Sequence, residues 1–336
     1  MWTSKERLPY NLHSMRILAA LVLGYYMVMG RVGAEVGESG ASMPRVPVGM
    51  TTAARSEIDN ALGISLNDAL TKSDATDAPV RHVTRQGRVV FIPEGCRSVE
   101  QPYDLVVHFH GAPTSMEPSF ERSGIGGVLA IFNLGIGSGK YEDTFAQRGA
   151  FEDSLARVGD VVAELCPGAS KMQRRIALSA WSAGYGAVWK ILDRQALADR
   201  IDAVLLADGL HAGFDPEHKA QRQINPFIMA PFSLYADRAA AGEKLLAITH
   251  SSITTPYAST TETANFLLVQ QNVARVSQNS QGPRPGMTLT SRADRGNLHV
   301  QGYAGVDAPA HCDHLHAMGE TLFPYLRELW SRKATH

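Results

Sequence analysis

Residues 175–190 read RIALSAWSAGYGAVWK, an apolar stretch that runs into a turn of small residues around Ser182. The first part, residues 176–180, has the character of a buried strand, and residues 185–195 have the pattern of a helix. Ala180 and Gly184, two positions before and after the serine, let neighbouring backbones approach closely in a tight turn. Such a turn would lift the Ser182 hydroxyl above the edge of a sheet.

Ala180, Ser182 and Gly184 together form a small-x-Ser-x-Gly pattern, with alanine at a position where glycine is more usual. A pattern this short recurs by chance, so its meaning depends on the strand before it and the helix after it. In that context it is typical of a nucleophile elbow, which exposes a serine for covalent chemistry. The alternative is a buried serine in an ordinary strand-to-helix turn.

The composition is that of a globular chain. Its 336 residues, 44% hydrophobic and 19% charged, are enough for one large domain or two smaller ones. The formal net charge is -1, and lysines and arginines form no clustered stripe. Because such a chain offers no positive field for a phosphate backbone, nucleic acid is not expected as a partner.

The N-terminal region has the pattern of a targeting segment. Met15 and Arg16 precede an apolar run at residues 17–29, and small residues follow it up to Ala34. The run is shorter than the ~20 residues of a stable membrane span, so residues 1–34 are expected to be an extension and a cleaved signal peptide. The alternative is an uncleaved anchor. The prediction is a secreted or periplasmic protein in which a flexible tether, residues 35–79, precedes one domain at residues 80–336.

The chain has three cysteines, Cys96, Cys166 and Cys312. Export would permit a disulfide such as Cys96 to Cys166, but the sequence does not decide the pairing. No C-x-x-C unit is present, which argues against a structural zinc site.

From residue 80 onward, apolar strand patterns alternate with helical patterns. Strands are expected at residues 82–92 (a pair), 103–109, 127–134, 176–180, 201–207, 245–249 and 298–303, and helices up to residue 165 and at residues 185–195, 261–272 and 312–330. Pro324 allows a kink in the last helix, and residues 278–286 are expected to form an exposed loop. This alternation predicts an α/β fold whose mostly parallel sheet is covered by helices on both faces.

In such a fold, functional side chains gather in the loops beyond the carboxyl ends of the strands. The side chains expected there are His110 with Gly111, Ser182, Asp208, His211, His250, and His311 before the last helix. This order of His-Gly loop, serine elbow, acid and late histidine resembles the α/β-hydrolase fold superfamily. The resemblance covers roughly residues 80–332.

The resemblance implies an esterase or related acyl hydrolase that forms an acyl-enzyme on Ser182 and needs no cofactor or metal. The substrate would be a small ester or acyl compound. A late histidine would act as the base, with His311 the first choice because Pro309 keeps that region at the start of the helix. His314, one turn further on, is the second choice, and His316 is expected to point elsewhere.

The orienting acid is expected to be Asp208, at the end of an apolar strand. The more common position in the family follows the next strand, but no carboxylate occurs there before Glu262, which is the second choice. Asp307 is a weaker third.

The oxyanion would be bound by the backbone N–H of Ala183 and by that of Gly111 or Ala112. His110 is expected to orient its own loop rather than to take part in the reaction. Residues 208–244 leave space only for a small lid, in which residues 225–235 could line one wall of a pocket.

Two other classes of function stay open. The first is a binding protein that keeps the fold without catalysis. The second is a metal-dependent hydrolase that uses some of His110, His211, His250 and His311, although no H-E-x-x-H spacing is present. The glycine-rich segment at residues 135–139 fits neither a P-loop nor a G-x-G-x-x-G pattern. The identity of the substrate and the oligomeric state cannot be inferred from the sequence.

Overall fold

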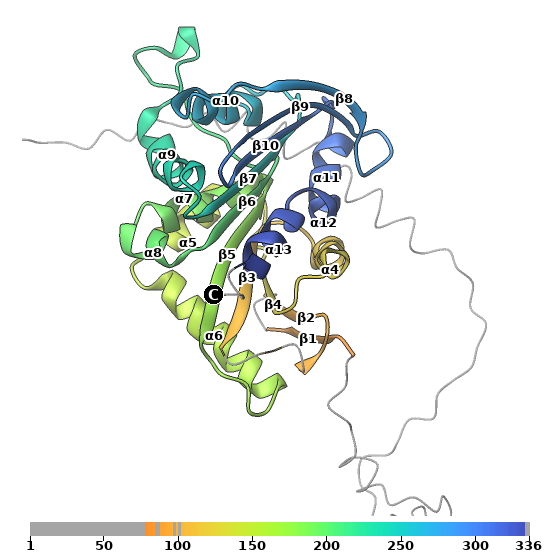
Figure 1. The fold of residues 1–336 in the computed structure, drawn as a ribbon. Helices are drawn as coiled ribbons and strands as arrows, with labels where there is room; N and C mark the ends of the chain where they lie inside the picture. Colours follow the sequence, from red (N-terminus) through yellow and green to blue (C-terminus); the bar gives the residue numbers. More distant parts are fainter. Residues whose placement is uncertain (1–77, 85–87, 97–98, 100–101, 333–336) are drawn as a thin grey trace, which may run out of the picture.

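The computed structural model describes residues 78–84, 88–96, 99 and 102–332. The predicted signal segment, residues 1–34, lies outside these residues, and so does the predicted tether up to residue 77. The described part of the chain forms one ten-stranded sheet with helices on both faces (Figure 1).

The sheet has a parallel centre and an antiparallel hairpin at each edge. Its strands are β1 (Val80–Val83), β2 (Val89–Ile92), β3 (Tyr103–Phe109), β4 (Val128–Phe132), β5 (Gln173–Trp181), β6 (Ala203–Ala207), β7 (Leu245–His250), β8 (Val276–Gln281), β9 (Thr288–Arg295) and β10 (Leu298–Tyr303). Across the sheet they follow the order β1-β2-β4-β3-β5-β6-β7-β10-β9-β8. The six strands from β4 to β10 in this order are parallel, whereas β1–β2 and β9–β8 pair antiparallel at the two edges.

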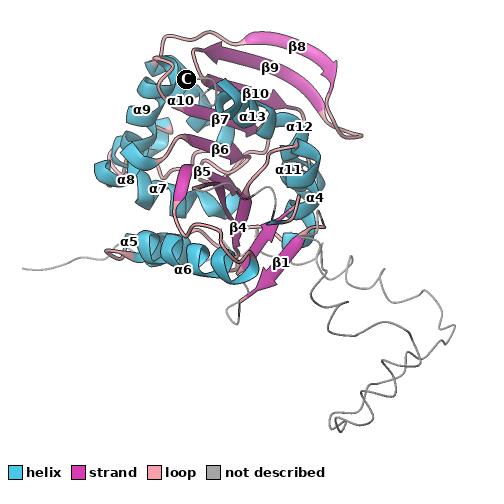
Figure 2. Ribbon diagram, turned by 60° about the horizontal axis from the view of Figure 1, so that its bottom comes forward, coloured by secondary structure: helices cyan, strands magenta, loops and turns pink. Residues whose placement is uncertain are grey.

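Two layers of helices enclose this sheet (Figure 2). One face is covered by α5 (Gly139–Ala146), α6 (Ala150–Leu165), α7 (Tyr185–Leu192), α8 (Gln195–Arg200), α9 (Pro226–Ala240) and α10 (Thr260–Gln270), and the other by α4 (Pro113–Ser123), α11 (Ala308–His316), α12 (Met318–Thr321) and α13 (Phe323–Arg332). Within β3, Leu105 and Val107 pack into the core of the first face and Val106 into that of the second. Burial on both faces explains why the central strands are mainly apolar. The predicted mostly parallel sheet with helices on both faces is confirmed.

The single helix predicted at residues 312–330 is wrong. The structure has three helical segments there, α11, α12 and α13, with Ala317 as the C-cap of α11. Pro324 lies in the first turn of α13, where a proline costs no hydrogen bond and its fixed φ suits the start of a helix. Pro324 therefore marks a helix start rather than a kink. Apolar side chains of all three segments, from Leu315 to Leu329, are buried in the same core cluster.

The exposed loop predicted at residues 278–286 is also wrong in its first half. Residues up to Gln281 belong to β8, which pairs with β9, a strand absent from the prediction. Every residue of β8 is exposed, whereas along β9 the exposed Thr290, Arg292 and Asp294 alternate with the less exposed Leu289 and Ser291 and the buried Ala293. A strand that is exposed on both faces, as β8 is, has no reason to alternate apolar and polar residues. In β9 the less exposed positions include a serine and an alanine, so the alternation of apolar and polar residues is too weak to reveal the strand.

A disulfide joins Cys96, after β2, to Cys166 at the end of α6. The third cysteine, Cys312 in α11, is free and buried. The structure thus contains the one pairing that the sequence suggested without deciding it. No helix within the described ranges combines the length and the apolar character needed to cross a bilayer.

Candidate active site

Ser182 lies at a sharp turn between β5 and α7. The strand ends at Trp181, a single 3-10 turn covers Ser182–Gly184, and α7 begins at Tyr185. Ser182 has a φ of 49°, in the left-handed region that residues other than glycine rarely adopt. Strain of this kind gathers at functional positions, where the surrounding structure holds it in place.

Two glycines let other loops pack directly against this turn. A Cβ atom on Gly184 would lie 2.1 Å from the carbonyl oxygen of Phe109, the last residue of β3. A Cβ atom on Gly209 would lie 2.6 Å from the backbone nitrogen of Ser182. Both distances are far shorter than any real contact, so these positions must be glycine. The loops after β3 and β6 therefore meet at Ser182.

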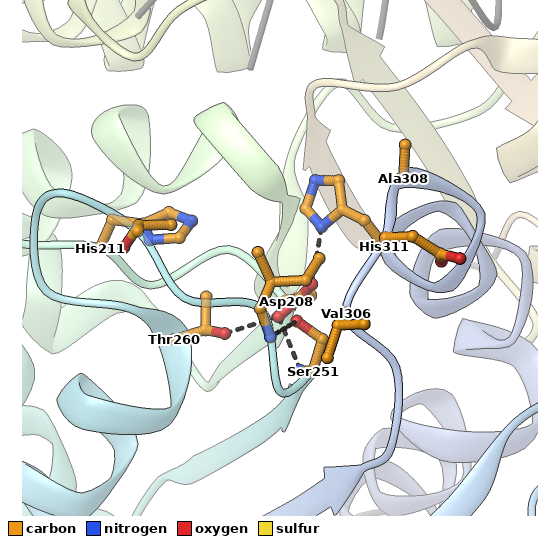
Figure 3. Close-up of a pocket in the computed structure, with 10 residues that line it drawn as sticks. Asp208, His211, Ser251, Thr260, Val306, Ala308 and His311 are labelled. Carbon is orange, nitrogen blue, oxygen red and sulfur yellow. Dashed lines mark hydrogen bonds and ion pairs between the residues drawn. The ribbon is translucent and has the colours of Figure 1, made fainter. Parts of the chain in front are cut away.

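Asp208 and His311 form a hydrogen-bonded pair next to this turn. Asp208 follows β6, is 1% exposed, and its Oδ2 accepts a hydrogen bond of 2.6 Å from Nδ1 of His311 (Figure 3). Its other oxygen, Oδ1, accepts from the backbone N–H of Ser251 at 2.8 Å and from the hydroxyl of Thr260 at 2.6 Å. Both carboxylate oxygens thus accept hydrogen bonds from protein groups and need none from water.

The charge of Asp208 determines where His311 carries its proton. Burial alone would raise the pKa of Asp208, but the nearby His314 and His311 and the hydrogen bonds from His311 and Thr260 hold it well below its ordinary value. An ionised carboxylate only accepts hydrogen bonds, so Nδ1 of His311 holds a proton and Nε2 carries the free electron pair of the neutral ring. Nε2 is buried and has no hydrogen-bond partner among the described residues, Ser182 included.

Neither a protein-family model nor a curated protein matches the sequence. Among solved structures, the chain is similar to the feruloyl esterase module from Clostridium thermocellum, with 11% identity, a TM-score of 0.43, and coverage of 75% of this chain and 91% of the other. It is also similar to carboxyl esterase 2 from the mycorrhizal fungus Tuber melanosporum, with 13% identity, a TM-score of 0.41, and coverage of 83% and 99%. A third is Est1E from Butyrivibrio proteoclasticus, with 13% identity, a TM-score of 0.39, and coverage of 75% and 99%.

The strand order, the turn at Ser182 after β5, and the loops that carry Asp208 and His311 after β6 and β10 agree with the resemblance found in the sequence. The chain has the mostly parallel sheet covered by helices on both faces, with the serine turn after β5, that the resemblance to the α/β-hydrolases implies. Asp208, the candidate acid, follows β6 rather than the next strand, β7, after which the sequence offers no carboxylate before Glu262.

The sequence interpretation missed Trp181, which positions His311. The indole Nε1–H of Trp181 donates to the backbone carbonyl of His311 at 2.9 Å, and the two rings lie 4.8 Å apart. The ring of His110 stacks on the indole at 5.1 Å, and Nδ1 of His110 lies 3.0 Å from the hydroxyl of Tyr141. His110 thereby anchors its own loop, in line with the expectation for it. The sequence feature that could have indicated this role is the bulky aromatic residue directly before Ser182.

The other late histidines have different partners. Nδ1 of His314 bonds to the hydroxyl of Thr249 at 2.8 Å in a fully buried site, and burial lowers its pKa. Nε2 of His316 lies 3.2 Å from the hydroxyl of Ser115. Of the three histidines considered from the sequence, His311 is the one whose ring is hydrogen-bonded to Asp208.

The two other candidate acids also lie elsewhere. Glu262 belongs to the capping box of α10 with Ser259 and forms an ion pair of 2.7 Å with Arg222. Asp307 is the N-cap of α11, where its carboxylate accepts from the backbone N–H of Ala310. Neither carboxylate is hydrogen-bonded to the ring of His311, because each is committed to the start of a helix.

The predicted oxyanion donors lie at the starts of two helices beside Ser182. Ala183 follows the serine directly, and Ala112 is the N-cap of α4. Gly111 before it has a φ of 120°, which requires glycine. N–H groups at a helix start have no partner within the helix and carry partial positive charge. Because Phe109 and Ala180 are neighbours across β3 and β5, both loops end beside the serine.

The histidines considered as metal ligands each have a partner of their own. His211 bonds to the carbonyl of Ala258, and His250 to that of Ser251. Over the ranges that the structure describes, no group of three or more His, Cys, Asp or Glu side chains is arranged to hold a metal ion.

Buried histidines make the stability of this domain sensitive to acid. Burial lowers the pKa of His108 to about 3, and those of His110, His211 and His250 to about 4, from an ordinary value of 6.5. In the unfolded chain these histidines bind protons near pH 6.5, whereas in the folded chain they stay neutral until the pH falls to about 4. The neutral histidines therefore contribute fully to the free energy of unfolding above pH 6.5. As the pH falls below 6.5, this free energy decreases by up to about 1.4 kcal/mol for each histidine and each pH unit.

We predict that the free energy of unfolding in urea falls by at least about 2 kcal/mol between pH 7 and pH 5. Replacement His108→Asn should make this decline shallower, because one buried ring no longer has to be charged on unfolding. A free energy of unfolding that stays constant or rises between pH 7 and pH 5 would contradict the prediction.

Proposed function

We propose that the chain is a serine hydrolase that cleaves small carboxylic esters through an acyl-enzyme on Ser182. The observation that carries the proposal is the 2.6 Å hydrogen bond from His311 to a buried, ionised Asp208, which leaves Nε2 of His311 unpartnered beside a strained serine turn. A serine hydroxyl is a poor nucleophile at neutral pH, and an oriented imidazole base is what activates it.

In the proposed reaction, substrate binding turns the Ser182 hydroxyl toward Nε2 of His311. The serine oxygen attacks the ester carbonyl while Nε2 takes its proton, and Asp208 stabilises the imidazolium that forms. The N–H groups of Ala183 and of Gly111 or Ala112 donate to the resulting oxyanion. Collapse of this intermediate breaks the ester bond, and His311 returns the proton to the departing alcohol.

The second half of the reaction follows the same path with water. His311 takes a proton from the water as it attacks the acyl-enzyme, and then gives that proton to Ser182 as the carboxylic acid leaves. The products are one acid and one alcohol, and the protein returns to its starting state. Each proton is passed through Nε2, while the Nδ1 proton stays on His311 in its hydrogen bond to Asp208.

We also propose that the protein is exported. The targeting pattern before Ala34 and the disulfide between Cys96 and Cys166 support this, since disulfides persist in oxidising compartments. N-terminal sequencing of the mature protein should give a chain that starts near Glu35. A cytoplasmic protein that retains residues 15–34 would contradict export.

The proposed activity is tested with p-nitrophenyl acetate, butyrate and octanoate. The purified protein should release p-nitrophenol from at least one of them, and a rapid initial burst would correspond to formation of the acyl-enzyme. If none is cleaved and fluorophosphonates do not react with the protein, the alternative of a non-catalytic binding protein is favoured.

A further inference from the structure

A small cavity lies beside the pair of Asp208 and His311. Its volume is about 60 Å³, and Asp208, His211, Thr255, Thr260, Val306 and His311 are among its ten lining residues. Ser182 is not among them. The cavity therefore lies on the side of the histidine base rather than at the serine. Space of this size holds roughly four water-sized positions, enough for a short group of a few heavy atoms.

His211 presents an electron pair in this cavity. Its Nδ1 lies 3.3 Å from the carbonyl oxygen of Ala258, and because a carbonyl only accepts, the ring proton is on Nδ1. Burial keeps the ring neutral by lowering its pKa to about 4. Nε2 is therefore an acceptor, and no described residue is hydrogen-bonded to it. The rings of Tyr185 and Tyr257 meet that of His211 edge-on at 5.7 and 5.1 Å and fix its plane.

The charged side chains of the cavity wall disfavour an anionic ligand. The hydroxyl of Thr255 donates to the carbonyl of Tyr257, and that of Thr260 donates to Asp208. Neither lysine nor arginine is among the ten lining residues, whereas the carboxylates of Asp208 and Asp307 are. A carboxylate or phosphate would meet like charge here with no cation to offset it, while a neutral group that donates a hydrogen bond meets the free pair of His211.

We propose that this cavity binds a hydroxyl group on the alcohol part of the ester, and that Nε2 of His211 accepts its hydrogen bond. The inference rests on the proposed function, because the alcohol side is assigned from the role of His311. That histidine must protonate the departing oxygen, so the alcohol leaves next to His311, and His311 is one of the residues that line the cavity. Figure 3 shows the rings of His211 and His311 on opposite sides of Asp208. The substrate class is therefore the monoester of a short diol or polyol.

The test compares 2-hydroxyethyl butyrate with propyl butyrate, which has a methyl group in place of the hydroxyl. Hydrolysis gives butyrate in both cases, with ethylene glycol or propanol as the alcohol, so a pH-stat measures both. The wild-type protein should prefer the hydroxyethyl ester by about tenfold in kcat/KM, the effect of one hydrogen bond to an acceptor that would otherwise be unpaired.

Two variants separate recognition from a structural role of His211. His211→Asn can keep the contact with Ala258 but has no atom at the position of Nε2, so the preference should fall to within about twofold of unity. His211→Gln places an amide oxygen near that position and should keep most of the preference. A loss of packing alone would lower turnover of both esters together and leave their ratio unchanged.

The outcomes are distinct. A wild-type ratio near one, or a ratio that survives His211→Asn, overturns the inference while the proposed function stands. If the wild-type protein cleaves neither ester and also fails with p-nitrophenyl esters, the proposed function fails and the inference falls with it. The wild-type ratio is decisive even if His211→Asn does not fold.

Discussion

Replacing Ser182 with alanine is expected to lower kcat for p-nitrophenyl butyrate by at least about 10⁴-fold, because no other group can form the acyl-enzyme. The melting temperature should change little, since alanine keeps the Cβ atom and the same backbone geometry at a φ of 49°. Steady-state kinetics and thermal unfolding followed by circular dichroism measure the two quantities.

Ser233→Ala is the matched control for this variant. Ser233 lies in α9, and its buried hydroxyl has no hydrogen-bond partner among the described residues. Its removal should leave kcat within about twofold of wild type, since its hydroxyl bonds to no described residue and does not line the cavity beside Asp208 and His311. If Ser182→Ala keeps more than about 1% of the activity while Ser233→Ala behaves as expected, Ser182 is not the nucleophile.

Replacing Asp208 with asparagine is expected to lower kcat by about 10⁴-fold through the wrong tautomer of His311. In the structure, Oδ1 of Asp208 accepts from Ser251 and Thr260, and Oδ2 accepts from His311. The amide oxygen of asparagine would stay with the two donors, so its NH₂ group would face Nδ1 of His311. Nδ1 must then accept, the ring proton moves to Nε2, and the base can no longer take a proton from Ser182.

Glu262→Gln is the control, because Glu262 was the alternative acid. It should cost about 1 kcal/mol or less in stability, through the cap of α10 and the partly exposed pair with Arg222, and leave kcat within a few-fold. Loss of turnover in Glu262→Gln together with an active Asp208→Asn would show that the acid has been assigned to the wrong residue.

The central strands could be predicted from sequence because they are buried on both faces. Tyr103–Phe109 and Leu298–Tyr303 were predicted at the bounds that the structure has, the first as a mainly apolar run and the second from alternating apolar and polar residues. The order of the strands could not be predicted, because nothing local in β3 and β4 specifies that β4 lies on the outer side of β3. Strand β9 was missed because the less exposed positions that alternate along it, Leu289, Ser291 and Ala293, include only one large apolar side chain.

The candidate site was predictable in its residue types and less so in its contacts. The turn at Ser182 has a local signature, and Pro309 correctly indicated that His311 lies in the first turn of its helix. The choice among Asp208, Glu262 and Asp307 depended on which carboxylate a histidine about a hundred residues away can reach, and that is a tertiary property. Trp181, Ser251 and Thr260 were missed for the same reason, since they act by holding other side chains.

The most direct test of the account is the reaction of the purified protein with a fluorophosphonate, followed by peptide mass spectrometry. The account predicts one phosphonyl group per chain on Ser182, no adduct in Ser182→Ala, and much slower labelling in Asp208→Asn. An unlabelled wild-type protein, or an adduct that persists in Ser182→Ala, would contradict it.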